Sequence, residues 1–192
     1  MDQNDCWKII QLYFKDKYLE RLVRHQLESY NYFVNHQLKN TIDMFNPVLV
    51  HSPHDYDEAS DKYTLEMEIT FENFQIYRPQ IHENNGATKI MFPMEARLRN
   101  FTYASTMTVD LSIKITTRHG ENLNSKETVM QKIPRVHIGK LPIMLKSSIC
   151  VLRQNSHLEH RITGECSYDP GGYFIINGSE KTVIAQERAA EN

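Results

Sequence analysis

Long apolar runs are missing from this 192-residue sequence, and no stretch approaches the ~18 residues that a membrane-spanning helix needs. The N-terminus also lacks the basic-then-apolar order of a secretory signal. Cysteine is scarce: Cys6, Cys150 and Cys166 are scattered and odd in number, which favours a reducing compartment over a disulfide framework. We therefore expect an intracellular protein that does not engage a membrane.

Zinc-binding signatures are lacking as well, because no Cys-x-x-Cys pair occurs. One cluster combines possible ligand types, but with the wrong spacing for a zinc knuckle: Cys150, His157, His160 and Cys166. Buried cysteines and surface histidines are the commoner explanation of such a cluster. We expect no metal ligands in this chain.

Catalytic motifs are also absent. Ser147 and Ser148 have no neighbouring histidine and acid in a recognisable arrangement, and no glycine-rich phosphate loop occurs. Gly171-Gly172 precedes an apolar run typical of a strand, whereas a phosphate-binding loop precedes a helix. We expect neither catalytic nor cofactor-binding residues here.

The charge is nearly balanced, at −2 overall, so nothing global points to nucleic acid. A composition of 40% hydrophobic and 24% charged residues is typical of a globular protein. A local basic stripe between Thr128 and Leu158 contains no acid and holds Lys132, Arg135, Lys140, Lys146 and Arg153. A solvated face and a phosphate-binding track both explain this stripe.

The end of the sequence has the pattern of a hairpin. Pro170-Gly171-Gly172 favours a turn, and Tyr173–Ile176 is a short apolar strand that suits burial. Asn177-Gly178 is the favoured pair for a two-residue hairpin turn, and Thr182–Ile184, which is β-branched throughout, would supply the returning strand. A hairpin this apolar must be packed under other elements.

Two helices are expected near the N-terminus. The first follows Asp5 as N-cap and places Trp7, Ile10, Tyr13 and Phe14 on one face. The second is indicated by apolar residues every three or four positions between Leu27 and Phe45, and Asn46-Pro47 ends it.

Extended segments dominate the middle of the sequence, after a loop over Pro47–Asp61. Alternation predicts strands at Lys62–Phe71 and Phe101–Thr117, and Val129–Ile138 is predicted as an edge or bulged strand because of Pro134. The remaining expectations are a turn at Asn84–Gly86, a short helix opened by Pro93, a turn at His119–Asn122 and a buried connection at Leu141–Lys146. The predicted fold class is α+β: two N-terminal helices packed on a mostly antiparallel sheet, ending in a buried hairpin.

Three ordered blocks, Phe92–Ser105, His137–Ser147 and Gly171–Arg188, resemble the second-largest (β-like) subunit of multisubunit DNA-dependent RNA polymerases, in its eukaryotic or large-DNA-virus form. The resemblance covers nearly the whole chain and is weakest over 46–62 and 118–130. That subunit runs to roughly a thousand residues or more, several domains by the usual length prior. The chain is therefore expected to be its N-terminal piece.

The resemblance implies that residues 1–192 form the N-terminal protrusion domain, with a pattern that continues to the last residue and indicates truncation at the C-terminus. The protrusion forms part of the cleft wall that guides DNA and the RNA–DNA hybrid. The enzyme would be a DNA-directed RNA polymerase, a nucleotidyltransferase. Its catalytic magnesium is held mainly by aspartates of the largest subunit, so no catalytic residue and no cofactor is expected in this chain.

The implied partners are the remainder of the second-largest subunit, the largest subunit, other polymerase subunits, the DNA template and the RNA transcript. The implied location is the nucleus for a cellular protein, and the virion or host cytoplasm for a viral one. The alternative is a free-standing nucleic-acid- or polymerase-binding module without polymerase activity.

Nucleic-acid contacts are implied at Lys181 and Gln186, which match positions bordering the path of new RNA in bacterial relatives. On a regular strand, residues five apart face opposite ways, so either the strand is irregular or only one of them reaches RNA. The alternative for Lys181 is an ion pair with Glu180 or Glu187.

Arg97 and Arg99 are further candidates for phosphate contact, because guanidinium geometry suits phosphate oxygens. Two positions apart on a helix, they do not face the same way. The alternative is that one of them pairs with a carboxylate such as Glu95 while the other is solvated.

Overall fold

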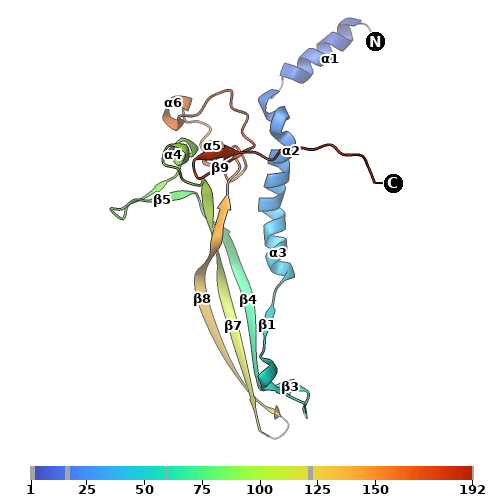
Figure 1. Ribbon diagram of the computed structural model, residues 1–192, viewed down its shortest axis with the longest axis vertical. Coiled ribbons are helices and arrows are strands. Elements are labelled where there is room, and N and C mark those ends of the chain that lie inside the picture. The colour runs from blue at the N-terminus through green and yellow to red at the C-terminus, as the bar shows by residue number, and fades with distance from the viewer. Residues whose placement is uncertain (1–2, 16–17, 59, 121–122, 192) are drawn as a thin grey trace. The chain divides into compact units, whose positions relative to one another are not determined.

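The computed structural model describes residues 3–15, 18–58, 60–120 and 123–191, and the α+β class is confirmed (Figure 1). The chain forms two compact units. Unit 1 comprises Met1–Phe33, Arg78–Ser105 and Leu141–Asn192, and unit 2 comprises Val34–Tyr77 and Thr106–Lys140.

More helical elements occur near the N-terminus than the two predicted. They are α1 (Gln3–Lys15), α2 (Tyr18–Tyr32), a π-helical turn (Phe33–Gln37) and α3 (Leu38–Met44). The predicted second helix therefore begins earlier than expected and is interrupted by the π-helical turn. Asp5 lies inside the first turn of α1, not before it.

The predicted apolar faces of these helices differ in their burial. Leu27 and Tyr30 on α2 are buried, and so is Val34 in the π-helical turn, whereas Phe45 at the far end of the stripe is exposed. On α1, the aromatic and aliphatic side chains are exposed: Trp7, Ile10 and Tyr13. The side chain of Phe14 lies outside the described residues.

A four-stranded sheet has the order β1 (Val48–Val50), β4 (Leu65–Ile76), β7 (Ala104–His119) and β8 (Ser125–Pro142). β4 is antiparallel to both β1 and β7, and Ile69 lies opposite Val48 on one side and Ile113 on the other. The alternation in the sequence correctly predicted β4 and β7. The predicted loop over Pro47–Asp61 is partly wrong, because it contains β1 and β2 (Tyr56–Asp57), the second of which pairs with β3 (Lys62–Tyr63).

β8 is an edge strand, as Pro134 predicted. Directly after the proline, Arg135 has a φ of 53°, and its N–H donates to Asp110 Oδ1 at 2.7 Å. The Asp110 carboxylate thus satisfies a backbone donor that the irregular strand leaves open. Of the predicted His119–Asn122 turn, Glu121 and Asn122 lie outside the described residues.

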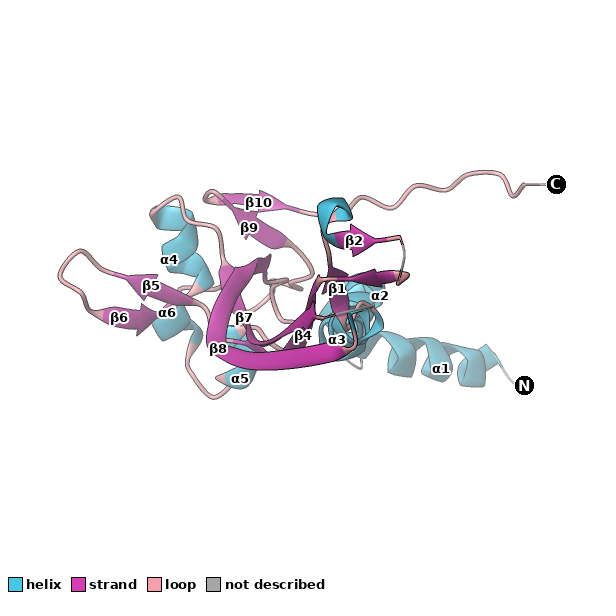
Figure 2. Ribbon diagram, turned by 90° about the horizontal axis from the view of Figure 1, so that it is seen from below, coloured by secondary structure: helices cyan, strands magenta, loops and turns pink. Residues whose placement is uncertain are grey.

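Unit 1 contains short elements, visible in Figure 2 as a set of small helices and hairpins. They are β5 (Gln80–His82) paired with β6 (Thr88–Ile90), α4 (Pro93–Leu98), α5 (Val151–Gln154), α6 (His160–Thr163), and β9 (Phe174–Ile176) paired with β10 (Ser179–Lys181). Pro93 occupies the first turn of α4, as predicted.

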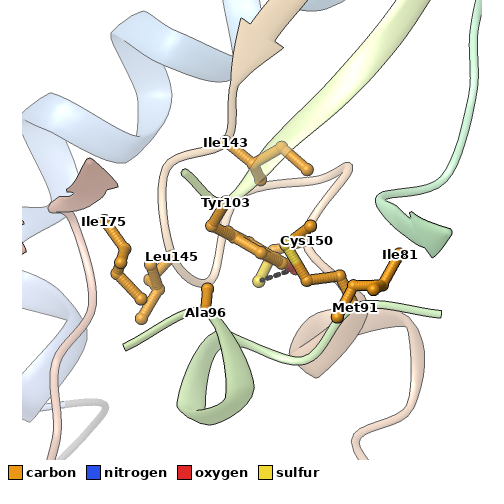
Figure 3. Close-up of a cluster of buried hydrophobic side chains, with 8 residues drawn as sticks. All are labelled: Ile81, Met91, Ala96, Tyr103, Ile143, Leu145, Cys150 and Ile175. Carbon is orange, nitrogen blue, oxygen red and sulfur yellow. Dashed lines mark hydrogen bonds between the residues drawn. The ribbon is translucent and has the colours of Figure 1, made fainter. Parts of the chain in front are cut away.

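The core of unit 1 gathers side chains from distant parts of the sequence (Figure 3). Its buried members are Ile81, Met91, Ala96, Tyr103, Ile143, Leu145, Cys150 and Ile175. The predicted buried connection is confirmed, since Ile143 and Leu145 are fully buried. Ile175 in β9 ties the C-terminal hairpin to this core.

Candidate nucleic-acid interface at the C-terminal hairpin

The predicted two-residue turn is confirmed. Ile176 pairs with Ser179, and the two residues between them, Asn177 and Gly178, have φ values of 50° and 78°. Positive φ at both central positions is the geometry that matches the twist of a hairpin.

The prediction that Thr182–Ile184 forms the returning strand is wrong: β10 is Ser179–Lys181. The two-residue turn sets the register, so Lys181 already lies opposite Phe174, the first residue of β9. Before β9, Gly171 and Gly172 both have positive φ and turn the chain away. Residues beyond Lys181 therefore have no strand to pair with.

The hairpin is anchored by backbone hydrogen bonds on both flanks. Gly178 N–H donates to the Phe101 carbonyl at 3.0 Å, and Tyr103 N–H donates to the Ile175 carbonyl at 2.9 Å. The prediction of a buried hairpin is only half correct. Ile175 is fully buried, but all of β10 is exposed, so one strand is held by the core and the other faces solvent.

Arg97 is held by two carboxylates and a phenol. Its guanidinium donates to both oxygens of Glu165 at 2.8 and 3.1 Å, to Glu180 at 2.7 Å and to Tyr173 Oη at 2.8 Å. Burial opposes the charge on Arg97, but the hydrogen bonds that Arg97 donates to Glu165 and the negative charge of this carboxylate outweigh burial, so the pKa of Arg97 is raised. The network links α4 to β10 through Glu180, and to the residue directly before β9 through Tyr173.

Arg99 lies in a second charge cluster. It donates to both oxygens of Glu83, at 2.6 and 3.0 Å, and to Glu95 at 3.2 Å. Lys89 contacts the same two acids, at 3.3 and 2.6 Å. The hydrogen bonds from Arg99 and Lys89 lower the pKa of Glu83 to about 2. Arg97 and Arg99 thus both face carboxylates of the chain itself.

Lys181 differs from both arginines. It is exposed, and within the described part of the chain no carboxylate lies in ion-pair distance of its ammonium group. Its neighbour Glu180 is engaged by Arg97 instead. Among the four predicted contact residues, Lys181 is therefore the cation that remains open to a ligand.

Gln186 lies in the exposed segment 182–191, which has no regular secondary structure. The argument that Lys181 and Gln186 face opposite sides of one strand does not apply, because the strand ends at Lys181. This segment is tied to α2 by a hydrogen bond from Gln26 Nε2 to the Val183 carbonyl, 3.0 Å long.

The basic stripe of the sequence is divided between the units. Lys132, Arg135 and Lys140 lie on β8, and Lys132 contacts Glu72 at 3.4 Å. In unit 1, Lys146 donates to the Asp169 carbonyl, and Arg153 donates to the Lys146 carbonyl at 3.4 Å.

Sequence reasoning missed the partners of Arg97. Glu165 and Glu180 are 68 and 83 positions away, and neither spacing carries a local signal. The family motif placed Glu180 in the hairpin, but nothing in the sequence connected it to α4.

Metal ligation has no support among the residues that the structure describes, where no three His, Cys, Asp or Glu side chains form a group that could hold an ion. Cys150 is buried beside Tyr103 Oη, and Cys166 is exposed. The side chain of His160 lies outside the described residues. None of the described helices is long and apolar enough to cross a membrane.

Comparisons with known proteins cover almost the whole sequence and agree on one protein family. Residues 21–191 match the family described as RNA polymerase beta subunit. DNA-directed RNA polymerase II subunit 2 of Arabidopsis thaliana is 39% identical over 192 residues, covering 99% of this chain and 16% of the plant protein. Subunit RPB2 of Schizosaccharomyces pombe is 38% identical, covering 100% of this chain and 16% of the yeast protein.

An archaeal relative is much shorter than these. DNA-directed RNA polymerase subunit Rpo2N of Methanothermobacter thermautotrophicus is 36% identical over 190 residues, covering 99% of this chain and 32% of that protein. The chain thus spans about a sixth of the two eukaryotic relatives and about a third of the archaeal one. The chain belongs to the RNA polymerase beta subunit family and corresponds to its N-terminal region.

Proposed function

We propose that residues 1–192 act as the protrusion of a DNA-directed RNA polymerase, a part of the cleft wall that guides DNA and the RNA–DNA hybrid. The observation that carries this proposal is the family match over residues 21–191, together with relatives that bear the polymerase name. The chain would work beside the remainder of the second-largest subunit, the largest subunit and other polymerase subunits, where transcription takes place in the nucleus, or in the virion or host cytoplasm for a virus.

The chain would contribute shape and charge to the polymerase but no bond-making group. The described residues do not fit a magnesium site, since they contain no cluster of three possible ligands. We therefore assign the metal-dependent nucleotidyl transfer to other parts of the polymerase. The role of this chain is to hold a positively charged side chain in a fixed place beside the nucleic acid.

Lys181 is the residue we assign to the phosphate backbone, as a point charge at the solvent-facing strand of the hairpin. Its position is fixed because β10 pairs with β9, whose Ile175 belongs to the core. Gln186 would follow along the exposed segment as a hydrogen-bonding group.

Arg97 and Arg99 have a different role in this proposal. Their guanidinium groups are paired with carboxylates, so they support the nucleic-acid contact indirectly. Arg97 holds β10 in place through Glu180, and Arg99 stabilises the end of α4 through Glu95. Freeing either guanidinium for a phosphate would cost the hydrogen bonds that it makes to these carboxylates.

A tagged chain expressed in its native cells tests the assignment to a polymerase. We expect the other polymerase subunits to copurify with it, and a Gly178→Val variant, whose hairpin turn should be lost, to recover less of them. A chain that purifies without any polymerase subunit, yet binds nucleic acid, would instead be a free-standing binding module.

Lys181→Ala tests the contact itself within the assembled polymerase. We expect weaker retention of short transcripts with unchanged nucleotide choice, because a phosphate contact carries no sequence information. The slope of log affinity against log salt should fall by up to about one unit, the share of one phosphate contact. An unchanged slope, with transcripts held as firmly as before, would remove Lys181 from the interface.

A further inference from the structure

An apolar hollow of about 370 Å³ lies beside the hairpin, entirely within unit 1. It is lined by Tyr30, Phe33, Leu141, Pro142, Phe174, Ile176 and Lys181. Three of these are aromatic, and Lys181 is the single charged residue among them. No pattern in the sequence indicates this hollow, because α2, β8 and the hairpin contribute to it from three distant segments.

Two of the three aromatic rings of the hollow, Tyr30 and Phe174, are held in place by contacts within unit 1. Tyr30 and Phe174 meet edge to face, with centroids 5.7 Å apart and planes at 68°. The Tyr30 hydroxyl donates to the Pro142 carbonyl at 2.6 Å, and burial raises the pKa of this phenol. The polar end of Tyr30 is therefore satisfied inside the protein, and the hollow offers ring and aliphatic surface instead of hydrogen-bonding groups.

A cation beside aromatic surface is the usual composition of sites that bind single-stranded nucleic acid. In such sites the cation follows the phosphate backbone while bases stack on the rings, without regard to sequence because every base has a π-face. Lys181 supplies the charge that complements a phosphate, and no described carboxylate neutralises it.

We propose that this hollow receives one unpaired base of a single-stranded RNA, stacked on an aromatic ring, while Lys181 contacts the adjacent phosphate. This inference rests on the proposed function and adds base capture to it. Because apolar atoms alone line the hollow, including the aliphatic part of the Lys181 side chain, capture would not discriminate between bases.

Binding of the 192-residue chain to two fluorescent single-stranded oligoribonucleotides tests the stacked base. One oligoribonucleotide has all its bases, and the other has the same phosphates with several abasic positions. We expect the abasic strand to bind the unmodified chain at least about fivefold more weakly, the low end of what one lost base stack costs.

Phe33→Leu is the matching variant of the protein, since leucine keeps the apolar volume and removes the ring. This variant should weaken binding of the complete strand by about the same factor and leave binding of the abasic strand unchanged. The losses from removing the ring and from removing the base would then not be additive. Phe45→Leu is the control, because Phe45 is an exposed ring on the other unit, outside the hollow. Urea unfolding of both variants checks that they are folded.

Lys181→Ala separates this inference from the proposed function. Lys8→Ala on α1 is its control for the loss of one positive charge. A reduced salt slope for Lys181→Ala, together with equal binding of complete and abasic strands, would overturn base capture and leave the phosphate contact standing. That result would assign the hollow to apolar side chains of a protein partner. Absence of any RNA binding by the chain would overturn both the contact and the capture.

Discussion

Unit 1 and unit 2 bury their apolar residues in different ways. Unit 1 places eight buried residues from separate segments in one cluster around Tyr103 and Leu145. Among the described residues of unit 2, the buried apolar side chains are Val34 and Val109, and three buried hydroxyl residues of β7 join them: Thr108, Ser112 and Thr116. Unit 1 therefore depends on complementary packing, and unit 2 depends more on its strand pairing.

Charge is also used differently in the two units. On the sheet of unit 2, Lys114 pairs with Glu68 at 2.8 Å and Arg118 with Glu66 at 2.6 Å, as neighbours on adjacent strands. In unit 1, Arg97 joins segments that are far apart in the sequence. Isolated cross-strand pairs are worth little each, whereas a network that joins distant segments constrains where its members lie. The hairpin that carries Lys181 is tied to α4 by this network, because Glu180 of β10 is one of its members.

The largest effect that sharpens this comparison is expected at Gly178. A Cβ there would lie 2.6 Å from Asn100 Oδ1 and 2.8 Å from Asn100 Cα, and its φ is +78°. Strain and overlap with backbone that cannot move away should together destabilise Gly178→Val by about 4 kcal/mol in urea unfolding.

Gly120 in unit 2 is the matched control for Gly178. It has a φ of +84°, but a Cβ there would meet nothing within 4 Å. Gly120→Val should therefore cost only the backbone strain, about 1–3 kcal/mol. Equal losses for the two variants would mean that Gly178 is not tightly packed, and the contrast between the units would fail at the hairpin.

The next largest effect is expected when a buried side chain is shortened and leaves a cavity. Leu145 is fully buried, so Leu145→Ala should cost about 3 kcal/mol through lost transfer energy and an unfilled cavity. Ile113 in β7 is half-buried, and Ile113→Ala should cost about 1 kcal/mol. Urea midpoints measured side by side check both values, and a larger loss at Ile113 would show that unit 2 has the more demanding core.

A third pair of variants compares two phenols. Tyr103 Oη accepts the buried Val151 N–H at 3.1 Å, so Tyr103→Phe leaves that donor without a partner and should cost about 1–2 kcal/mol. Tyr77 in unit 2 is exposed; its hydroxyl donates to Gln75 at 3.0 Å and accepts only a long hydrogen bond, 3.5 Å, from Thr108 Oγ1, so Tyr77→Phe should change stability by less than about 0.5 kcal/mol. Thermal unfolding of both variants measures the difference, and similar shifts would contradict it.

Local sequence patterns predicted which helices, strands and turns form better than they predicted what those elements pack against. Asn177-Gly178 sufficed for the turn, because both residues tolerate positive φ, and Pro93 sufficed for the start of α4. The returning strand was misplaced because β-branched residues at Thr182–Ile184 favour strand locally, whereas the register set by the turn ends the pairing at Lys181.

The candidate site was only partly readable from the sequence. The family motif drew attention to Lys181, and the structure leaves its charge open to a ligand. The carboxylates that occupy Arg97 and Arg99 come from other segments, and so do the rings around the hollow, so their roles depend on tertiary contacts that no periodicity encodes. Likewise, the alternation of β7 predicted a strand but not that three of its hydroxyl residues, Thr108, Ser112 and Thr116, would be buried.

The smallest expected effect is the pH dependence of the surface charges in the two units. The pKa of Glu83 in unit 1 is lowered to about 2 by its hydrogen bonds to Arg99 and Lys89, so it stabilises the fold above its ordinary pKa of 4.5, and this stability is lost as the pH falls toward 2. The pKa of Asp110 in unit 2 is lowered by the hydrogen bond from the Arg135 N–H. Its contribution to stability is therefore also lost as the pH falls below the ordinary value of 3.8.

Glu83→Gln should therefore be less stable than the unmodified chain near neutral pH, and the gap in urea midpoint should close between about pH 5 and about pH 2. Asp110→Asn should show a smaller gap at every pH, because the asparagine carbonyl still accepts the Arg135 N–H, and the losses are the charge and the exposed hydrogen bond that Oδ2 accepts from Asn73 Nδ2. Added salt should shrink the Glu83 gap more than the Asp110 gap, because Glu83 pairs with two cationic side chains, Arg99 and Lys89, whereas Asp110 accepts from the backbone N–H of Arg135. A Glu83 gap that stays constant with pH would show that its carboxylate does not stabilise unit 1, and the contrast in how the two units use charge would not hold.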